Sequence, residues 1–200
     1  REYPNYSSYL AHQGRKLHKR MHVLYANFRW KMKAIRRRVQ PLIGRSVRGK
    51  RVLCLGARLG EEVVVFKSLR ASFAIGIDVN PGRGNRFVIA GDFHSCPFCD
   101  CSFDLIYTNC VDHALDLDKL LTEVRRLLRP KGRVLLEVSL AEELRTSHVV
   151  GGKTRVEYGN FESMIWDDPE DVVVAFAGLG TVIGRRQDTA YLTVLIEVNK

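Results

Sequence analysis

The stretch VLCLGARLGEEV, residues 52–63, decides the fold of this chain. An apolar run stops at Gly56, a second glycine follows at Gly60, and acidic and apolar residues then resume. This order is typical of a strand, a tight loop and the start of a helix that together bind a nucleotide-like ligand. Because glycine has no Cβ, the backbone can turn sharply at both positions and approach a ligand closely. We therefore expect a ligand-binding loop at the carboxyl end of a strand.

Short apolar runs alternate with helical patterns beyond this loop. We expect strands at 52–55, 73–77, 86–90, 103–107 and 133–138, and helices at 61–69, 116–128 and 169–177. This alternation predicts an α/β fold, a three-layer Rossmann-like sheet that is mostly parallel and covered by helices on both faces. Too few residues separate the last two expected strands, 181–185 and 191–198, for a parallel crossover, so we expect an antiparallel C-terminal strand. Residues 141–166 show no clear period.

Five motifs of this region follow one another in a characteristic order: VLCLGARLGEEV, IGIDVNPG, AGDFHSCPF, SFDLIYTN and LLTEVRRLLRPKGRVLLEV. In residue type, order and spacing they resemble the class I S-adenosylmethionine-dependent methyltransferase superfamily, in particular its methyltransferase type 11-like domains. The resemblance covers residues 52–138. It implies a methyltransferase-like domain over 46–200 that uses S-adenosyl-L-methionine as cofactor.

Acidic residues follow the second and third expected strands. Asp78 ends the second strand, where a carboxylate can accept hydrogen bonds from both hydroxyls of a ribose. The alternative is a turn acid before the sequence NPG. The resemblance implies that Asp92 receives the adenine amino group and that Phe93 flanks the ring. The candidate cofactor-binding residues are Gly56, Arg58, Gly60, Asp78, Asp92 and Phe93.

Two residues of the glycine loop depart from the family pattern. Cys54 stands in the strand where the family usually carries an acid, and a thiol cannot make the same hydrogen bonds. Arg58 stands where glycine is frequent, and since arginine adopts a positive φ less readily, we expect a wider or differently turned loop. A guanidinium is also suited to hold the carboxylate of the cofactor's methionine moiety. A working loop and an inactive one are therefore both open alternatives.

The stretch TNCVDHALD, residues 108–116, is the candidate catalytic segment because it follows the fourth expected strand. Methyl transfer from a sulfonium is an in-line displacement, so the protein mainly aligns the nucleophile and accepts a proton where needed. Asn109, Asp112 and His113 are suited to these roles, with His113 as a base near neutral pH. The alternative is that DHALD caps the helix that begins near Asp116.

The five cysteines cluster in the middle of the chain. An odd number of them is unlike a secreted disulfide framework, so we expect a reducing intracellular compartment, either the cytoplasm or an organelle. The segment HSCPFCDC, residues 94–101, combines a histidine with three cysteines, as zinc sites do. Because it coincides with the proline-aromatic loop of the family, we expect no metal there. The sequence begins at Arg1, which leaves room for an upstream targeting or anchor segment.

The excess positive charge of the chain lies at its front. Residues 1–51 hold 15 Lys and Arg against one acid, Glu2, whereas the net charge of the whole chain is +10. A concentrated positive segment attracts polyanions. Residues 15–51 are therefore a candidate site for RNA or for an anionic membrane surface.

The same region shows a helical repeat of apolar residues. They recur at intervals of three, four and seven residues through 10–39, which predicts one long basic amphipathic helix closed by Pro41 and Gly44. We expect this helix to form a separate N-terminal segment of 1–45. The alternative to polyanion binding is a helix that packs on the following domain and exposes a solvated basic face.

Together these patterns predict methyl transfer from S-adenosylmethionine to an acceptor that the sequence does not identify. The altered glycine loop and the basic front suggest one alternative of another class. It is a catalytically inactive methyltransferase-fold protein that serves as a structural or RNA-binding subunit.

Overall fold

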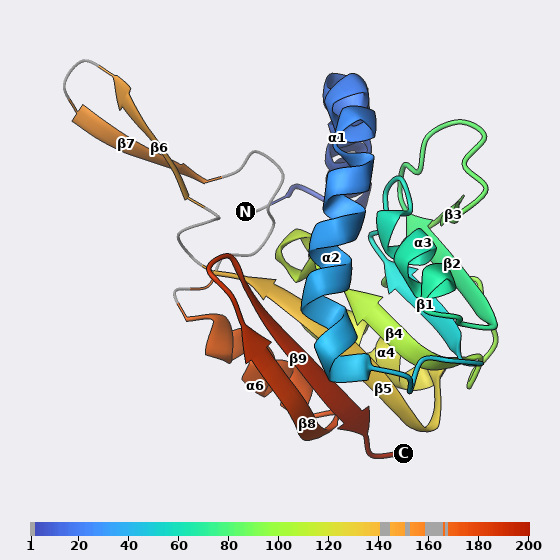
Figure 1. Ribbon diagram of the computed structural model, residues 1–200. Helices are drawn as coiled ribbons and strands as arrows, with labels where there is room; N and C mark the ends of the chain where they lie inside the picture. The colour runs from blue at the N-terminus through green and yellow to red at the C-terminus, as the bar shows by residue number, and fades with distance from the viewer. Residues whose placement is uncertain (1–2, 141–144, 151–152, 159–165, 167) are drawn as a thin grey trace.

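The computed structural model describes residues 3–140, 145–150, 153–158, 166 and 168–200. Its main element is a seven-stranded sheet with the order β3-β2-β1-β4-β5-β9-β8 (Figure 1). The strands are β1 (Arg51–Leu55), β2 (Phe73–Asp78), β3 (Val88–Ala90), β4 (Phe103–Thr108), β5 (Leu128–Ser139), β8 (Gly180–Gln187) and β9 (Tyr191–Val198). The helices are α1 (Tyr6–Ala26), α2 (Phe28–Ile43), α3 (Glu61–Ser68), α4 (Leu117–Leu127) and α6 (Pro169–Ala177), with a short 3-10 helix, η1 (Val111–His113).

The sheet has the predicted topology. Strands β3, β2, β1, β4 and β5 run parallel, and β9 runs antiparallel to both β5 and β8. The strand order reverses between β1 and β4, and in open parallel sheets such a reversal opens a crevice beyond the carboxyl ends of the strands. The predicted α/β fold and its C-terminal antiparallel strand are therefore confirmed.

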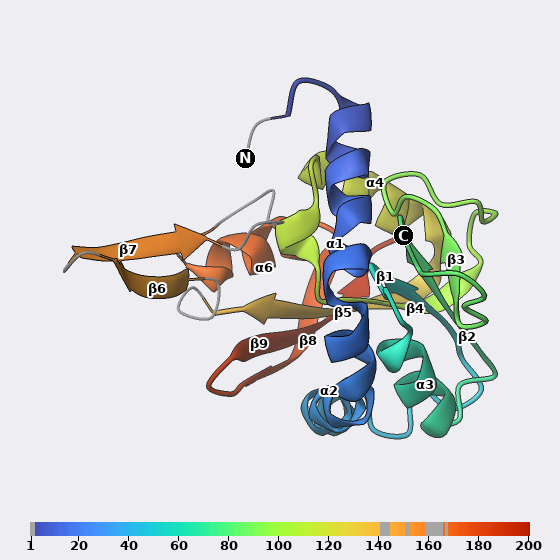
Figure 2. The same ribbon diagram turned by 90° about the horizontal axis from the view of Figure 1, so that it is seen from above.

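Helices cover both faces of the sheet (Figure 2). α2 and α3 pack on one face, and α4 and α6 pack on the other. The central strand β1 contributes to both cores, with Val52 and Cys54 on the side of α2 and α3, and Leu53 and Leu55 on the opposite side. Burial on both sides explains why this strand is an unbroken apolar run.

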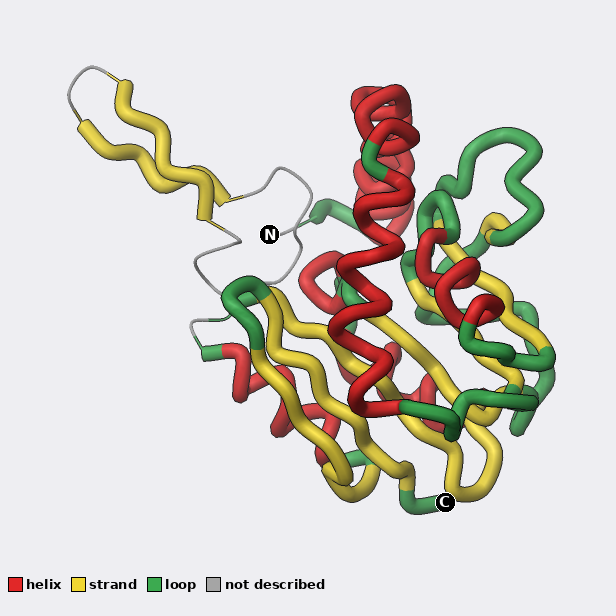
Figure 3. The backbone as a smooth tube through the Cα atoms, viewed as in Figure 1, coloured by secondary structure: helices red, strands yellow, loops and turns green. Residues whose placement is uncertain are grey.

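Residues 10–39 are helical as predicted, but they form two helices. The interruption at Asn27 is visible as a short break in the helical tube of Figure 3, and Figures 1 and 2 show that α1 and α2 meet at a sharp angle. α2 packs on the sheet through Ile35, Val39 and Ile43. α1 turns away across the carboxyl edge of the sheet, and one straight helix could not cover both surfaces.

Two further segments differ from the prediction. Pro41 lies inside the last turn of α2, which ends at Gly44 with a φ of +48°. β6 (Arg145–Val150) and β7 (Lys153–Tyr158) form an antiparallel hairpin where no period was evident, and Figure 1 shows it apart from the main sheet. Most of the hairpin residues are polar or charged, so no apolar alternation marks its strands.

Candidate functional site

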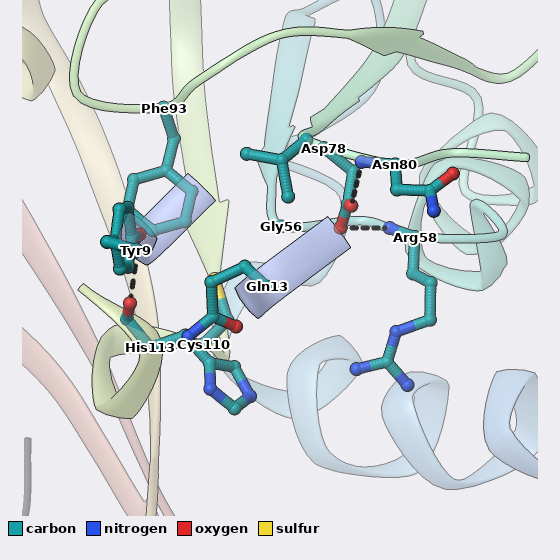
Figure 4. A pocket seen from close by; sticks show the side chains of 10 residues that line it. Tyr9, Gln13, Gly56, Arg58, Asp78, Asn80, Phe93, Cys110 and His113 are labelled. Atoms are coloured by element: carbon teal, nitrogen blue, oxygen red, sulfur yellow. Dashed lines mark hydrogen bonds between the residues drawn. The ribbon is translucent and has the colours of Figure 1, made fainter. Parts of the chain in front are cut away.

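The carboxyl ends of β1, β2 and β4 meet at the reversal of strand order. A cavity lies there, and Figure 4 shows the side chains around it. We call it the crevice, and its lining residues are Tyr9, Gln13, Gly56, Arg58, Asp78, Val79, Asn80, Phe93, Cys110 and His113. Of the six predicted cofactor-binding residues, Gly56, Arg58, Asp78 and Phe93 line it directly.

The glycine loop needs its two glycines for space as well as for backbone conformation. Gly56 has a φ of +65°, and a Cβ there would lie 2.2 Å from the Sγ atom of Cys110. Gly60 has a φ of +91°, and a Cβ there would lie 2.7 Å from the Cβ of Phe87. Burial raises the pKa of the Cys110 thiol to about 12, so this side chain below the loop is a neutral packing group.

Arg58 behaves differently from the sequence-based expectation. Its φ is +41°, so the arginine adopts the left-handed conformation itself and the loop does not have to turn in another way. The backbone N–H of Arg58 donates to Oδ2 of Asp78 at 3.0 Å, which compensates part of this strain. Figure 4 shows the guanidinium directed away from Asp78, so it does not block the carboxylate.

Asp78 makes the contacts of a turn acid, which was one of the two roles that the sequence left open. Its Oδ1 accepts from the backbone N–H of Asn80 at 2.9 Å, as a turn acid does, and its Oδ2 accepts from Arg58. An ionised carboxylate has about four acceptor sites. Two of them are used here, so the turn geometry leaves capacity for the hydroxyls of a ligand in the crevice.

Asp92 is held by two residues that the sequence analysis did not assign to the site. Its Oδ1 accepts from the backbone N–H and from Nδ1 of His94, at 2.9 and 2.8 Å, and its Oδ2 accepts from the hydroxyl of Tyr6. Burial opposes ionisation of Asp92, but the hydrogen bonds from His94 and Tyr6 outweigh it and lower its pKa. The backbone N–H of Asp116 donates to Nε2 of His94, so the ring proton lies on Nδ1.

Helix α1 closes the crevice from above. Tyr9 is 1% exposed and its hydroxyl donates to the backbone carbonyl of His113 at 3.0 Å, while Gln13 lines the cavity beside it. The remaining cavity has a volume of about 40 Å³, whereas ligand pockets usually measure about 300–1,000 Å³. In this arrangement the crevice is too small for an adenosyl ligand, and Tyr9 and Gln13 would have to move before one could enter.

The three predicted catalytic residues come together in a neighbouring cavity of about 330 Å³, which we call the α2 cavity. Its lining includes Asn109, Asp112 and His113, and the Nε2 atom of His113 lies 3.6 Å from Oδ2 of Asp112. The predicted helix cap is real, but it is Asp116, whose Oδ1 accepts from the backbone N–H of Lys119 at 2.9 Å. Asp112 and His113 lie one turn earlier in η1, at the wall of the cavity.

An ion pair buried between α2 and the sheet shapes the same cavity. Nε and Nη2 of Arg38 donate to the two carboxylate oxygens of Glu137 at 2.7 and 3.0 Å, and the hydroxyl of Tyr107 donates to Oε2 at 2.7 Å. The guanidinium also lies over the ring of Tyr191, 4.2 Å from its centroid. Arg38 lies 99 positions and Tyr107 lies 30 positions from Glu137 in the sequence, so no local pattern could have predicted these contacts.

The loop that carries Asp92 and Phe93 is anchored from α4. Arg126 donates to the backbone carbonyls of Cys96 and Phe98, and Oε1 of Glu123 accepts from the backbone N–H of Cys96 at 2.7 Å.

The cysteines of this loop differ in exposure, because Cys96 is buried and Cys99 is exposed. Among the residues that the structure describes, no cluster of three or more His, Cys, Asp or Glu side chains could hold a metal ion. Within the same residues, no helix is long and apolar enough to span a lipid bilayer.

Residues 53–136 match the family model of a methyltransferase domain. A curated protein of Encephalitozoon cuniculi (strain GB-M1), whose name describes it as a candidate methyltransferase, is 31% identical over 110 residues. This match covers 50% of the chain and 52% of that protein, so the chain spans about half the length of this relative.

Solved structures share the fold. A 1,6-didemethyltoxoflavin-N1-methyltransferase of Burkholderia thailandensis, solved with 1,6-didemethyltoxoflavin and S-adenosylhomocysteine, has a TM-score of 0.67 and 17% identity, and the match covers 100% of this chain and 93% of that one. An S-adenosylmethionine-dependent methyltransferase of Thermotoga maritima has a TM-score of 0.65 and 14% identity, with 94% and 99% covered. Residues 53–136 are therefore similar in sequence to a methyltransferase domain, and the solved structures share the fold of the domain that carries the crevice.

Proposed function

We propose that this chain transfers the methyl group of S-adenosylmethionine to an acceptor bound in the α2 cavity. One observation carries the proposal: the crevice and the α2 cavity share Gly56, Arg58, Cys110 and His113 as lining residues. A ligand that fills the crevice would therefore present one end to the cavity with the candidate catalytic residues. When bound, the cofactor supplies a methyl group on a positively charged sulfur, which is already an activated leaving group.

The residues of the crevice have distinct roles in this proposal. Asp78 accepts hydrogen bonds from the ribose hydroxyls with the acceptor capacity that its turn contacts leave. Asp92 accepts from the adenine amino group once Tyr6 releases its Oδ2, and Phe93 packs against the ring. Arg58, with its guanidinium outside the crevice floor, takes the carboxylate of the methionyl tail.

On the acceptor side, the α2 cavity supplies a base and an orienting group. His113 is within 3.6 Å of the Asp112 carboxylate, which holds the imidazole and stabilises its protonated form. Asn109 offers both a donor and an acceptor to orient a polar acceptor group. His113 removes a proton from the acceptor as the new bond to carbon forms, while Asn109 orients the acceptor group.

Binding of S-adenosylhomocysteine, the product form of the cofactor, tests the first step. Titration calorimetry should give saturable binding to the wild type and a loss of about 10-fold or more in affinity for Asp78→Asn, since a hydrogen bond to a charged group contributes about 1.5–3 kcal/mol. Asp118→Asn, an exposed acid of α4, is the matched control and should bind like the wild type. Absence of binding to the folded wild-type protein at millimolar ligand would refute the proposal.

A second proposal concerns the basic front of the chain. A groove of about 820 Å³ lies between the end of α2 and the turn after α3, and it has no acidic side chain in its lining. We call it the arginine groove because its charged lining residues are Arg36, Arg37, Arg45, Arg48 and Arg70. We propose that this groove binds the phosphates of RNA, which would bring an RNA-bound acceptor near the α2 cavity.

Fluorescence anisotropy with a labelled single-stranded RNA tests the second proposal. The affinity should fall steeply between about 50 and 200 mM salt, and Arg45→Glu/Arg48→Glu should weaken it about 10-fold or more. Lys131→Glu/Arg186→Glu changes the charge equally at exposed positions outside the groove and serves as control. Equal effects of the two double variants, or binding to anionic vesicles in place of RNA, would contradict an RNA site in this groove.

A further inference from the structure

The first turn of α3 contains a buried carboxyl group without a complete set of partners. Glu62 is 7% exposed, and its Oε2 atom has no hydrogen-bond partner among the residues that the structure describes. An unpaired buried carboxylate lowers the stability of the folded state, so such a group either keeps its proton or pairs with a cation. Its neighbour Glu61 does not share this condition, because Lys31 lies 3.7 Å from its Oε1.

The surroundings of Glu62 define what it can bind. It lines the α2 cavity beside Gly56 and Arg58, at the boundary with the crevice. The charged and titratable groups that interact with it are Glu61, Lys31, Arg58, Cys54, Tyr107 and Cys110. Burial, followed by the charge of Glu61, raises the pKa of Glu62 to about 8. At neutral pH the carboxyl is therefore mostly protonated and ready to exchange its proton for a cationic ligand.

Cys54 explains why the carboxyl comes from the helix. The thiol occupies the strand position where an acid was expected, and it is fully buried on the α3 side of the sheet. Burial, followed by the charge of Glu62, raises the pKa of this thiol, so the thiol stays neutral. A neutral thiol in the strand supplies no negative charge for a cationic ligand, whereas Glu62 lines the α2 cavity with a carboxyl group.

We propose that Glu62 binds the ammonium group of the methionyl tail of the cofactor, while Arg58 binds its carboxylate. The proposal rests on the proposed function, because it assigns one subsite of the same ligand. A zwitterionic amino acid needs one anionic and one cationic partner, and Glu62 and Arg58, which both line the α2 cavity, supply them. On binding, the proton of Glu62 passes to the solvent and the ammonium takes its place.

Calorimetry with two ligands tests this assignment. S-adenosylhomocysteine carries the amino-acid tail, whereas 5′-methylthioadenosine keeps the adenosyl thioether and lacks the tail. Glu62→Gln should weaken S-adenosylhomocysteine about 10-fold or more and leave 5′-methylthioadenosine within about 2-fold. Glu170→Gln, the same change in the first turn of α6, is the matched control and should leave both affinities unchanged.

Proton release gives a second readout. Titrations near pH 7 in buffers of different ionisation enthalpy should show that the wild type releases about one proton per S-adenosylhomocysteine. Glu62→Gln should release none with that ligand, and the wild type none with 5′-methylthioadenosine. Glu62→Asp, which keeps the charge but shortens the side chain, replaces Glu62→Gln if the latter does not fold, and should weaken only the ligand with the tail.

The outcomes separate the two proposals. If the wild type binds both ligands and Glu62→Gln binds S-adenosylhomocysteine unchanged, or loses both ligands equally while folded, the assignment of Glu62 is overturned and the proposed function stands. If the folded wild type binds neither ligand, the proposed function fails, and the subsite fails with it.

Discussion

At the scale of single residues, the hydroxyl of Tyr6 is hydrogen-bonded to the carboxylate of Asp92, which is the group that would accept the adenine amino group in the proposed function. It donates to Oδ2 of Asp92, and burial together with this bond raises the pKa of Tyr6, so the phenol keeps its proton. In the proposed function, an adenine amino group that enters the crevice competes for the same oxygen. The Tyr6 hydrogen bond therefore stabilises the closed crevice against the ligand.

Tyr6→Phe removes this competition without removing the ring. We expect the affinity for S-adenosylhomocysteine to rise by about 10-fold or more, since a hydrogen bond to a carboxylate contributes about 1.5–3 kcal/mol. Calorimetry on the variant and the wild type measures the change. A weaker affinity would mean that Tyr6 contacts the bound ligand rather than excluding it.

The raised pKa of Glu62 predicts a pH-dependent stability. Burial holds this pKa near 8 in the folded chain, whereas the ordinary value is 4.5. The unfolded carboxyl loses its proton first as the pH rises, so the contribution of Glu62 to stability is full below about pH 4.5 and is lost progressively up to about pH 8. Glu62→Gln cannot ionise, so its melting temperature relative to the wild type should rise between pH 5 and pH 8. A constant difference across that range in thermal melts would show that Glu62 does not titrate in this way.

At the scale of elements, α2 is fixed to the sheet by the pair of Arg38 and Glu137. The carboxylate of Glu137 is fully buried and accepts hydrogen bonds from Arg38 and from the hydroxyl of Tyr107. We expect Glu137→Ala to lower the free energy of unfolding by about 3–5 kcal/mol, because it leaves a mostly buried guanidinium unpaired. Urea unfolding measures this loss. The double variant Arg38→Met/Glu137→Leu should recover much of it, and a double variant as unstable as Glu137→Ala would contradict the explanation.

Elements buried on both faces were the ones that the sequence predicted well. β1, β2 and β4 are near-continuous apolar runs, and their observed ends lie within one residue of the predicted ones. The bend at Asn27 was missed because no proline or glycine marks it. The β6–β7 hairpin was missed because its strands show no apolar alternation, although the sequence between them is Gly151–Gly152.

The residues of the candidate site also divide into those that local sequence patterns predict and those that they do not. Gly56, Gly60 and Asp78 follow from motif spacing, because strand ends and tight turns are local features. Tyr6, Tyr9 and Glu62 could not be predicted, since their roles depend on contacts between elements. Tyr6 and Asp92, for example, are 86 positions apart. Tyr6 and Tyr9 lie at helical spacing, but this spacing does not distinguish side chains that face a crevice from side chains that pack in a core.

At the scale of the whole molecule, α1 and the sheet enclose the crevice together. Tyr9 contacts η1 through the carbonyl of His113, and Asn80 donates to the backbone carbonyl of Gly14, so the first half of α1 is held at both sides of the opening. A cavity of about 40 Å³ cannot admit the ligand in this arrangement. Opening of α1 therefore has to precede binding.

Stopped-flow fluorescence tests this order of events. The observed rate of S-adenosylhomocysteine binding should level off as the ligand concentration rises, because the opening step becomes limiting. Tyr9→Ala removes the largest side chain over the crevice and should raise the plateau several-fold. A rate that stays linear in ligand concentration, with no change in Tyr9→Ala, would mean that α1 does not control access.

The central claim is that an adenosyl ligand binds beyond the carboxyl ends of β1 and β2 and is held by Asp78. A crystal structure of the protein with S-adenosylhomocysteine tests it most directly. We predict both ribose hydroxyls at hydrogen-bond distance, about 2.7 Å, from the Asp78 carboxylate, with Tyr9 and Gln13 displaced from their present positions. A structure grown at saturating ligand with Tyr9 still in the crevice, or with the ligand bound elsewhere, would contradict the claim.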